Sequence, residues 1–368
     1  MKKSVQHFQT GKKGLMRQVG RVAATLLLGG AGGVLFWALS FPLPFMLGAI
    51  AAVSAASIAG LPTRAPQAIR APMSTVIGAM LGASFSPEIV AGAGEWVLPM
   101  IALGLFVAAS ALSCMTFFRR VMGYDSRTAY FAGMPGGLVD MVAFADQFGA
   151  DVRKVALVHA IRILLIVFTV PLGVQLISGV DLSGTPPRPD RSADALEVWM
   201  WLLPTLVMGA ALGHVLRLPA KFILGPMIVS AVIHGAGWSD FALPSALVIF
   251  AQVVIGTTLG ARFAGTTGRE FMQMVPGALG SVVILLALTI VFAWGVAQFG
   301  GGSPVALVLS YSPGGFAEMG LIAVSLGIDA AFVATHHVAR LVYVGLGGIL
   351  ISRLAIDRDD ISPGSSSE

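Results

Sequence analysis

The sequence predicts an all-α, polytopic integral membrane protein made of two inverted repeats. Charged residues form 11% of the 368-residue chain, less than half the share of about 25% that is usual in a soluble domain, and hydrophobic residues form 56%. Apolar runs of spanning length, about 20 residues, recur along the whole chain. The third observation is that one stretch of sequence occurs twice.

The repeat is clearest around two Pro-Gly-Gly motifs. Residues 133–142 read GMPGGLVDMV, and residues 311–320 read YSPGGFAEMG. Pro313 therefore lies 178 positions after Pro135. The same offset of 178 relates three further pairs: Asp140 and Glu318, His159 and His337, Arg162 and Arg340. The two copies thus retain most of the few charged residues that are expected inside the membrane.

The chain divides into five segments. A basic N-terminus (1–19) precedes the first membrane repeat (20–178), and a polar, Pro-rich linker (179–196) leads to the second repeat (197–353). The charged, Ser-rich tail (354–368) is expected to be disordered. The expected spans are 22–40, 43–60, 71–86, 96–118 and 155–178 in the first repeat, and 197–216, 221–239, 243–261, 275–298 and 330–352 in the second.

Each repeat also holds a Pro-Gly-Gly segment, at 128–148 and 304–326, and the distribution of basic residues favours a re-entrant path for both. If neither segment crosses, only Arg188 and Arg191 of the basic loop residues lie outside. If both cross, six more basic residues move outside: Arg153, Lys154, Arg217, Lys221, Arg262 and Arg269. The re-entrant topology gives about ten transmembrane helices, opposite orientations for the repeats, and a bacterial inner-membrane protein with both termini cytoplasmic.

The Pro-Gly-Gly motifs are the first candidate site. Proline removes a backbone donor and glycine permits unusual backbone angles, so a helix cannot continue through them and polar backbone groups are freed. Such backbone is tolerated at membrane depth only inside protein or beside a wet cavity, and matching broken helices in two repeats indicate a transporter's binding site. A structural kink is the alternative. The residues concerned are Pro135, Gly136, Gly137, Pro313, Gly314 and Gly315.

The acids and the His-x-x-Arg pairs are the other candidates. Asp140 and Glu318 could bind a coupling cation or proton, or could cap the following helix or pair with an arginine. His159 and His337 could carry a proton, while Arg162 and Arg340 could hold an anion because each His-Arg pair lies on one helix face. The alternatives for the arginines are snorkelling to the interface, or pairing with the acid of their own or the other repeat as a structural lock or a gate.

Several kinds of site are excluded at the level of motifs. The chain has one cysteine and no His-x3-His pair, so we expect no metal site and no cofactor. No Walker A motif is present, which excludes an ATP-driven pump in this chain. His214 and His234 lie near predicted helix ends and are expected to be ordinary surface residues. The basic residues flank apolar runs and indicate lipid headgroups, with no nucleic-acid partner.

The duplicated Pro-Gly-Gly-x-x-(Asp/Glu)-Met motifs, each followed by His-x-x-Arg, resemble the AbrB family of bacterial membrane proteins over residues 20–353. This resemblance implies an internally duplicated membrane protein. Members carry the labels ammonia monooxygenase and regulator of gene expression. A monooxygenase requires a redox metal or flavin, and the sequence has no ligand cluster for either, so we expect no enzyme activity.

The sequence predicts a secondary transporter or exporter of a small anionic metabolite, coupled to protons or cations. A membrane-embedded sensor that influences gene expression indirectly is the alternative, and a monooxygenase is a third. The expected partners are the lipid bilayer and a small-molecule substrate, and a homo-oligomer is left open.

Overall fold

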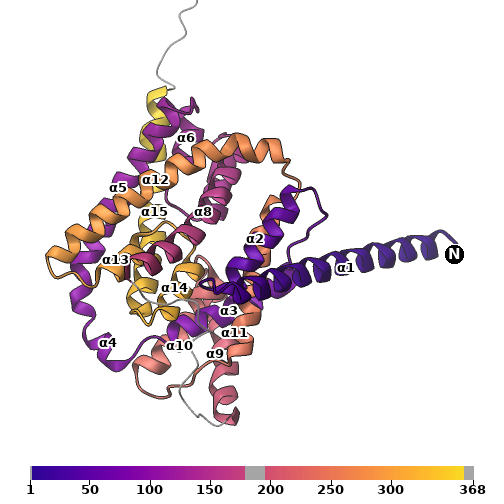
Figure 1. The fold of residues 1–368 in the computed structure, drawn as a ribbon, viewed down its shortest axis with the longest axis horizontal. Helices are drawn as coiled ribbons and strands as arrows, with labels where there is room; N and C mark the ends of the chain where they lie inside the picture. The colour runs from indigo at the N-terminus through magenta and orange to yellow at the C-terminus, as the bar shows by residue number, and fades with distance from the viewer. Residues whose placement is uncertain (1, 179–194, 360–368) are drawn as a thin grey trace, which may run out of the picture. The chain divides into compact units, whose positions relative to one another are not determined.

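The computed structural model describes residues 2–178 and 195–359, and side chains are described for 16–176 and 196–347. All regular secondary structure in these ranges is helical, and Figure 1 labels most of the helices. The first half contains α1 (Lys2–Ala38), α2 (Pro44–Ile58), α3 (Gln67–Gly82), α4 (Pro87–Ala91), η1 (Ala93–Trp96), α5 (Val97–Arg120), α6 (Ser126–Gly133), α7 (Leu138–Gln147) and α8 (Val152–Ser178). The second half contains α9 (Ala195–Val215), α10 (Lys221–Gly235), α11 (Ser245–Gly260), η2 (Ala261–Phe263), α12 (Gly268–Gln298), α13 (Pro304–Tyr311), α14 (Phe316–Ser325) and α15 (Ala330–Asp359).

The chain is an all-α polytopic membrane protein, as the sequence predicts. Within the described residues six helices are long and apolar enough to cross a membrane: 16–38, 93–120, 152–176, 196–215, 245–263 and 268–298. Each of the ten expected spans contains a helix, but α2 and α10 have only 15 residues. The number of crossings and the inversion of the repeats therefore stay predictions.

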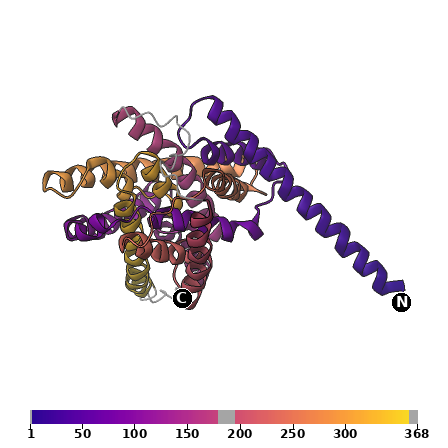
Figure 2. The same ribbon diagram turned by 90° about the horizontal axis from the view of Figure 1, so that it is seen from below.

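The ends of the chain differ in detail from the predicted boundaries. Helix α1 begins at Lys2, well before the predicted first span, and its N-terminal part extends beyond α2, against which its later part packs (Figures 1 and 2). Helix α15 continues to Asp359, beyond the predicted start of the tail. Most of the predicted linker, residues 179–194, and the end of the tail, residues 360–368, lie outside the described residues.

The helices form two compact units, and each unit takes parts of both sequence repeats. Unit 1 consists of Met1–Ala93, Val167–Gln273 and Ala317–Ala331. Unit 2 consists of Gly94–Ile166, Met274–Phe316 and Phe332–Glu368. The opening helices of both repeats thus lie in unit 1 and most of the later helices in unit 2, except that α14 and the end of α8 belong to unit 1.

Glycines hold the helices of unit 1 at very short range. Helix α1 packs against α2 where Gly32 faces Gly48, and α9 packs against α10 where Gly209 faces Gly225. A Cβ on Gly48 would collide with the backbone of Gly32, and a Cβ on Gly225 would collide with that of Gly209. Such close approach gives van der Waals contact and is the usual way in which membrane helices associate without a hydrophobic driving force.

The helices that follow exchange partners between the repeats. Helix α2 packs against α11, and two glycines of α11, Gly256 and Gly260, contact α2. Helix α10 packs against α3 in the same way, through Gly78 and Gly82 of α3. The turns before α2 and α10 also match. Leu43 and Ala220 have positive φ values of 45° and 46°, which non-glycine residues rarely adopt. The same strained turn therefore occurs once in each repeat.

Aromatic contacts organise unit 2 around α5. The ring of Phe106 on α5 stacks on Tyr311 of α13 with centroids 5.4 Å apart, and it meets Phe292 of α12 edge-on at 5.7 Å. The Tyr311 hydroxyl donates to the Pro99 carbonyl at 2.7 Å, and Tyr343 of α15 donates to the Met100 carbonyl at 3.3 Å. Helix α5 thus anchors the helix before the second Pro-Gly-Gly motif.

Candidate functional site

Both Pro-Gly-Gly motifs interrupt helices, as the sequence predicts. Helix α6 ends at Gly133 and α7 begins at Leu138, while α13 ends at Tyr311 and α14 begins at Phe316. Proline lacks the N–H that would continue the helical ladder, so the last carbonyls of α6 and α13 lose their partners. The four short helices have 8 to 10 residues each, far below the roughly 20 needed to span a bilayer alone.

Arg162 of α8 supplies hydrogen bonds to the first break. Its guanidinium donates from Nη1 to the Met134 carbonyl at 3.0 Å and from Nη2 to the Gly136 carbonyl at 3.4 Å. The side chain is 1% exposed, so these contacts are made in the interior of the protein. The planar fork of arginine suits two adjacent acceptors, and it replaces the donors that the break removed.

Arg340 of α15 does the same at the second break. Nη1 donates to the Ser312 carbonyl at 2.6 Å, and Nη2 donates to the Gly314 carbonyl at 2.9 Å. The sequence separations of 28 and 26 residues equal those in the first repeat. Both arginines therefore act as caps on interrupted helices through backbone carbonyls, and the described side chains show no pairing of either arginine with Asp140 or Glu318.

The two paired histidines have the same tautomer but different surroundings. Nε2 of His159 lies 2.8 Å from the Phe131 carbonyl, and Nε2 of His337 lies 3.1 Å from the Leu309 carbonyl. A carbonyl can only accept, so Nε2 carries the proton in both rings. Nδ1 of His159 accepts from Arg162 Nη2 at 2.8 Å, whereas Nδ1 of His337 is buried and finds no hydrogen-bond partner among the described residues.

Unit 2 contains all of these groups and both Pro-Gly-Gly motifs. Arg340 lies within electrostatic range of Arg162. A Cβ on Gly136 would lie 2.8 Å from Cγ1 of Val344, so the first break touches the helix that carries Arg340. The unit thus brings together eleven of the twelve predicted site residues: Pro135, Gly136, Gly137, Asp140, His159, Arg162, Pro313, Gly314, Gly315, His337 and Arg340.

The twelfth residue, Glu318, belongs to unit 1, and its surroundings differ from those of Asp140. Glu318 is 5% exposed and interacts electrostatically with Arg262 and Arg70. Asp140 is exposed in the first turn of α7, and its Oδ2 would lie 2.8 Å from a Cβ on Gly137. A negative charge at this position interacts favourably with a helix start, but no side-chain hydrogen bond caps α7 among the described residues, so capping by Asp140 stays a prediction.

The two buried guanidiniums of unit 2 have no carboxylate partner among the residues whose side chains are described. The ion pair found there, Lys154 Nζ with Asp151 Oδ2 at 3.2 Å, involves neither arginine. The backbone carbonyls satisfy the hydrogen bonds of both guanidiniums but carry no net charge. Two buried positive charges without a counter-charge are costly, and an anion nearby would relieve that cost.

Buried polar atoms without a partner in the protein also concentrate in unit 2. Six of the eight such atoms found among the described side chains belong to it: Ser110 Oγ, Tyr130 Oη, Arg162 Nε, Thr289 Oγ1, His336 Nε2 and His337 Nδ1. Buried polar groups are normally paired, so each of these atoms is free to bond water or a ligand. Arg162 Nε is a donor, and the two imidazole nitrogens are acceptors.

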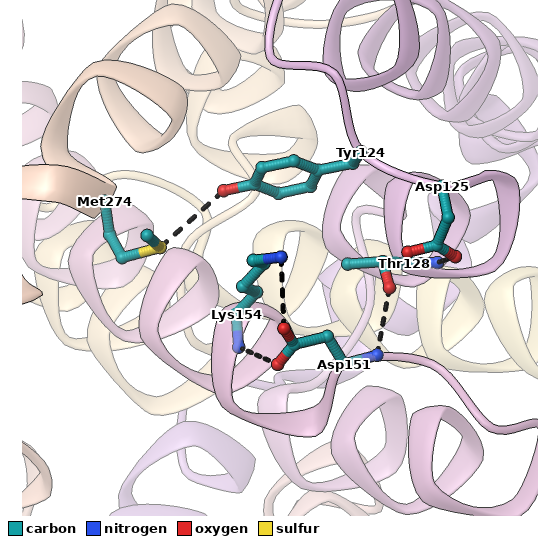
Figure 3. A network of polar contacts seen from close by, with 6 residues as sticks. All are labelled: Tyr124, Asp125, Thr128, Asp151, Lys154 and Met274. Atoms are coloured by element: carbon teal, nitrogen blue, oxygen red, sulfur yellow. Dashed lines mark hydrogen bonds and ion pairs between the residues drawn. The ribbon is translucent and has the colours of Figure 1, made fainter.

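A polar network holds the starts of α6 and α8, the two helices that present Phe131 and Arg162 (Figure 3). Asp125 accepts from the Thr128 N–H at 2.9 Å, and the Thr128 hydroxyl accepts from the Asp151 N–H at 2.9 Å. Asp151 in turn accepts from the Lys154 N–H at 3.0 Å. Each aspartate therefore caps a helix, and Thr128 joins the two caps.

The charges of these caps lie outside the spanning segments. Partial burial acts to raise the pKa of the Asp125 carboxyl, but hydrogen bonds from Thr128 lower it more, so the pKa lies below its ordinary value. Partial burial also acts to raise the pKa of the Asp151 carboxyl. Hydrogen bonds from Lys154 and the positive charge of Lys154 lower that pKa, which therefore lies below its ordinary value. Both carboxylates are therefore stabilised in their charged form by the fold.

Two histidines are buried although the sequence did not indicate it. His234 is 6% exposed, and its ring nitrogens contact the carbonyls of Ser230 and Phe241, so the prediction that it is a surface residue was wrong. His336 is fully buried, and its Nδ1 donates to the Phe332 carbonyl at 2.8 Å. The apolar residues around His336 in the sequence were the one signal that could have indicated its burial. Among the described residues, His, Cys, Asp and Glu form no group of three that could hold a metal ion.

Comparison with known proteins agrees with the duplicated motifs. A family model described as "Transition state regulatory protein AbrB" matches residues 45–355. The chain is 26% identical to "Putative regulator AbrB" of Escherichia coli (strain K12) over 326 residues, covering 86% of this chain and 91% of the relative. It is 30% identical to "Uncharacterized protein YhjN" of Bacillus subtilis (strain 168) over 248 residues, covering 60% of this chain and 61% of that one. The chain belongs to the AbrB family of proteins.

Proposed function

We propose that this protein is a secondary transporter or exporter of a small anionic metabolite in the bacterial inner membrane, coupled to protons or cations. One observation carries the proposal. Arg162 and Arg340 place two buried positive charges without a carboxylate partner beside two interrupted helices of one compact unit. Interrupted helices at matching positions of two repeats are the usual substrate site of secondary transporters.

The substrate would lie beside the breaks, and the chain offers suitable groups there. Backbone N–H groups at the starts of α7 and α14 point toward the breaks and carry a partial positive charge. Arg162 Nε is a further buried donor. In this role Gly136 and Gly314 hold the guanidiniums through their carbonyls, while Asp140, Glu318, His159 and His337 are the titratable candidates for coupling.

Uptake into proteoliposomes tests the proposal. Purified protein is assayed with acetate, lactate, succinate, phosphate and sulfate, and we expect saturable uptake of at least one of them. Uptake should be lost in folded Arg162→Gln and Arg340→Gln variants and retained in Arg127→Gln, because Arg127 is exposed and its guanidinium donates to the Phe148 carbonyl, at 3.5 Å. Equal uptake without either buried guanidinium, or uptake of none of these anions, would contradict the proposal.

The name of the E. coli relative favours a second candidate, a membrane-embedded regulator. It would bind its ligand at the same breaks and signal to a cytoplasmic partner. A stable partner in a pull-down, together with ligand binding that produces no flux, would support this candidate over the transporter.

A further inference from the structure

Unit 2 contains two His-Arg pairs that match in sequence and in hydrogen bonds to the breaks, yet they differ at one atom. In the first pair, Nδ1 of His159 accepts from Arg162. In the second pair, Arg340 donates to Ser312 and Gly314, and Nδ1 of His337 has no partner in the protein. Protonation of His159 would therefore break its contact with Arg162, whereas His337 can accept a proton without losing a hydrogen bond.

We propose that His337 Nδ1 is the proton acceptor of this transporter, and that it takes its proton together with the anion. The inference rests on the proposed function and deepens it, because it assigns the coupling ion and the residue that carries it. The proton comes from the aqueous phase and adds to the Nδ1 lone pair, while Nε2–H stays bonded to the Leu309 carbonyl. The neutral imidazole becomes an imidazolium, and the step is reversed when the proton leaves.

The surroundings of His337 explain why the anion is required. Arg340 and His336 lie on the same helix, and Arg162 of α8 acts on Arg340. From the other elements, α13 presents the Leu309 carbonyl and α14 presents the Phe316 ring, whose centroid is 6.2 Å from that of the imidazole. No carboxylate acts on His337 among the described residues. A third buried positive charge beside two arginines is strongly unfavourable by itself.

An anion changes this balance. A proton on His337 adds one positive charge to the buried site, and one negative charge of an anion bound beside the guanidiniums offsets it. Each ligand thereby favours the binding of the other, and this mutual effect is reciprocal by linkage. The result is anion–proton symport, with anion binding that becomes tighter as the pH falls.

His336 is the nearest competitor for this role. Its Nδ1 donates to the Phe332 carbonyl, and its Nε2 is also buried without a partner in the protein. Its ring lies against Phe332 at 4.0 Å and near Tyr311 at 6.3 Å, and it makes no hydrogen bond to a residue of either break. His337 is the better candidate because it bonds α13 directly before the break and lies one turn from Arg340.

Proton entry into proteoliposomes distinguishes these residues. Liposomes containing trapped pyranine are clamped at zero membrane potential, and phosphate or succinate is added outside. We expect anion-stimulated proton entry with the wild type and with His336→Asn, because His336 bonds only the Phe332 carbonyl of its own helix among the described residues. In His337→Gln, whose amide can still donate to the Leu309 carbonyl, proton entry should fall to the level of protein-free liposomes. Exchange of internal for external anion should continue in this variant.

Each other outcome overturns the inference. Anion-stimulated proton entry that persists in His337→Gln, or anion uptake by the wild type without proton entry, would reject the role of His337 and leave the transporter intact. Absence of any anion uptake by the wild type would reject the proposed function and this inference with it.

Nitrogen NMR keeps the test decisive if His337→Gln does not fold. Wild-type protein labelled with ¹⁵N-histidine is reconstituted in lipid, and His337 is assigned through His336-His337, the one pair of adjacent histidines in the chain. We expect a neutral Nε2–H ring without anion, and protonation of both nitrogens after phosphate or succinate is added at mildly acidic pH. A His337 ring whose protonation does not respond to either anion would contradict the proposal.

Discussion

Arg340 donates a 2.6 Å hydrogen bond to the backbone carbonyl of Ser312, the residue directly before the second Pro-Gly-Gly motif. The equivalent bond from Arg162 to Met134 is 3.0 Å long. A helix break in a membrane protein leaves carbonyls that water cannot solvate, so each must find a donor in the protein. These arginines are therefore needed for the fold as well as for any ligand, and variants must be judged on both.

Replacing either arginine by lysine should destabilise the protein. Lysine keeps the charge but cannot donate to two carbonyls in a fixed fork, so at least one buried carbonyl loses its partner at a cost of about 1–3 kcal/mol. Arg340→Lys should cost more than Arg162→Lys because its bonds are shorter. Thermal unfolding in detergent can be followed through the buried Cys114, the one cysteine of the chain. Arg127→Lys is the exposed control and should change little.

The glycine contacts of unit 1 predict a clear contrast among alanine variants. Gly48→Ala and Gly225→Ala should each destabilise by about 1–3 kcal/mol or more, because the new methyl group meets backbone that cannot move cheaply. Gly30→Ala has nothing within 4 Å and should stabilise α1 by roughly 0.5–1 kcal/mol. Denaturation midpoints for the three variants provide the comparison. Equal behaviour of all three would argue against close helix packing here.

The aspartate caps of α6 and α8 predict that the free energy of unfolding decreases at acid pH. The pKa values of Asp125 and Asp151 are lowered in the folded protein, so their contribution is present above the unfolded value of about 3.9. This contribution to stability is lost as the pH falls through the lowered pKa values that the two carboxyls have in the folded protein. Tryptophan fluorescence during thermal unfolding should show this loss below about pH 4. Asp151→Asn keeps a capping side chain without the charge, and its stability should depend less on pH in this range.

The two acids of the repeats should tolerate neutral replacement differently. Asp140→Asn removes an exposed charge from a helix start, which is worth about 0.3–1 kcal/mol. Glu318→Gln leaves Arg262 and Arg70 without the buried carboxylate that interacts with them, so it should cost more. Side-by-side melting curves measure the difference. If Asp140→Asn is the more damaging variant, Asp140 does more than place an exposed charge at the start of α7.

Local chemistry made much of the site predictable. Pro135 and Pro313 act on their own helices, so the positions of both breaks followed from the sequence. The partners of Arg162 and Arg340 did not follow, because carbonyl, carboxylate and anion are all reasonable acceptors until the packing of α8 and α15 is known. Likewise Arg262 and Arg70 occupy positions where the other repeat has Ser84 and Val248, so the duplication gave no hint of their contact with Glu318.

The exchange of partners in unit 1 makes the two halves of the chain depend on each other. Helix α2 of one copy packs against α11 of the other, and α10 packs against α3. A polypeptide that ended after the first repeat would leave both contacts unmade, whereas two half-length polypeptides expressed together could supply them to each other.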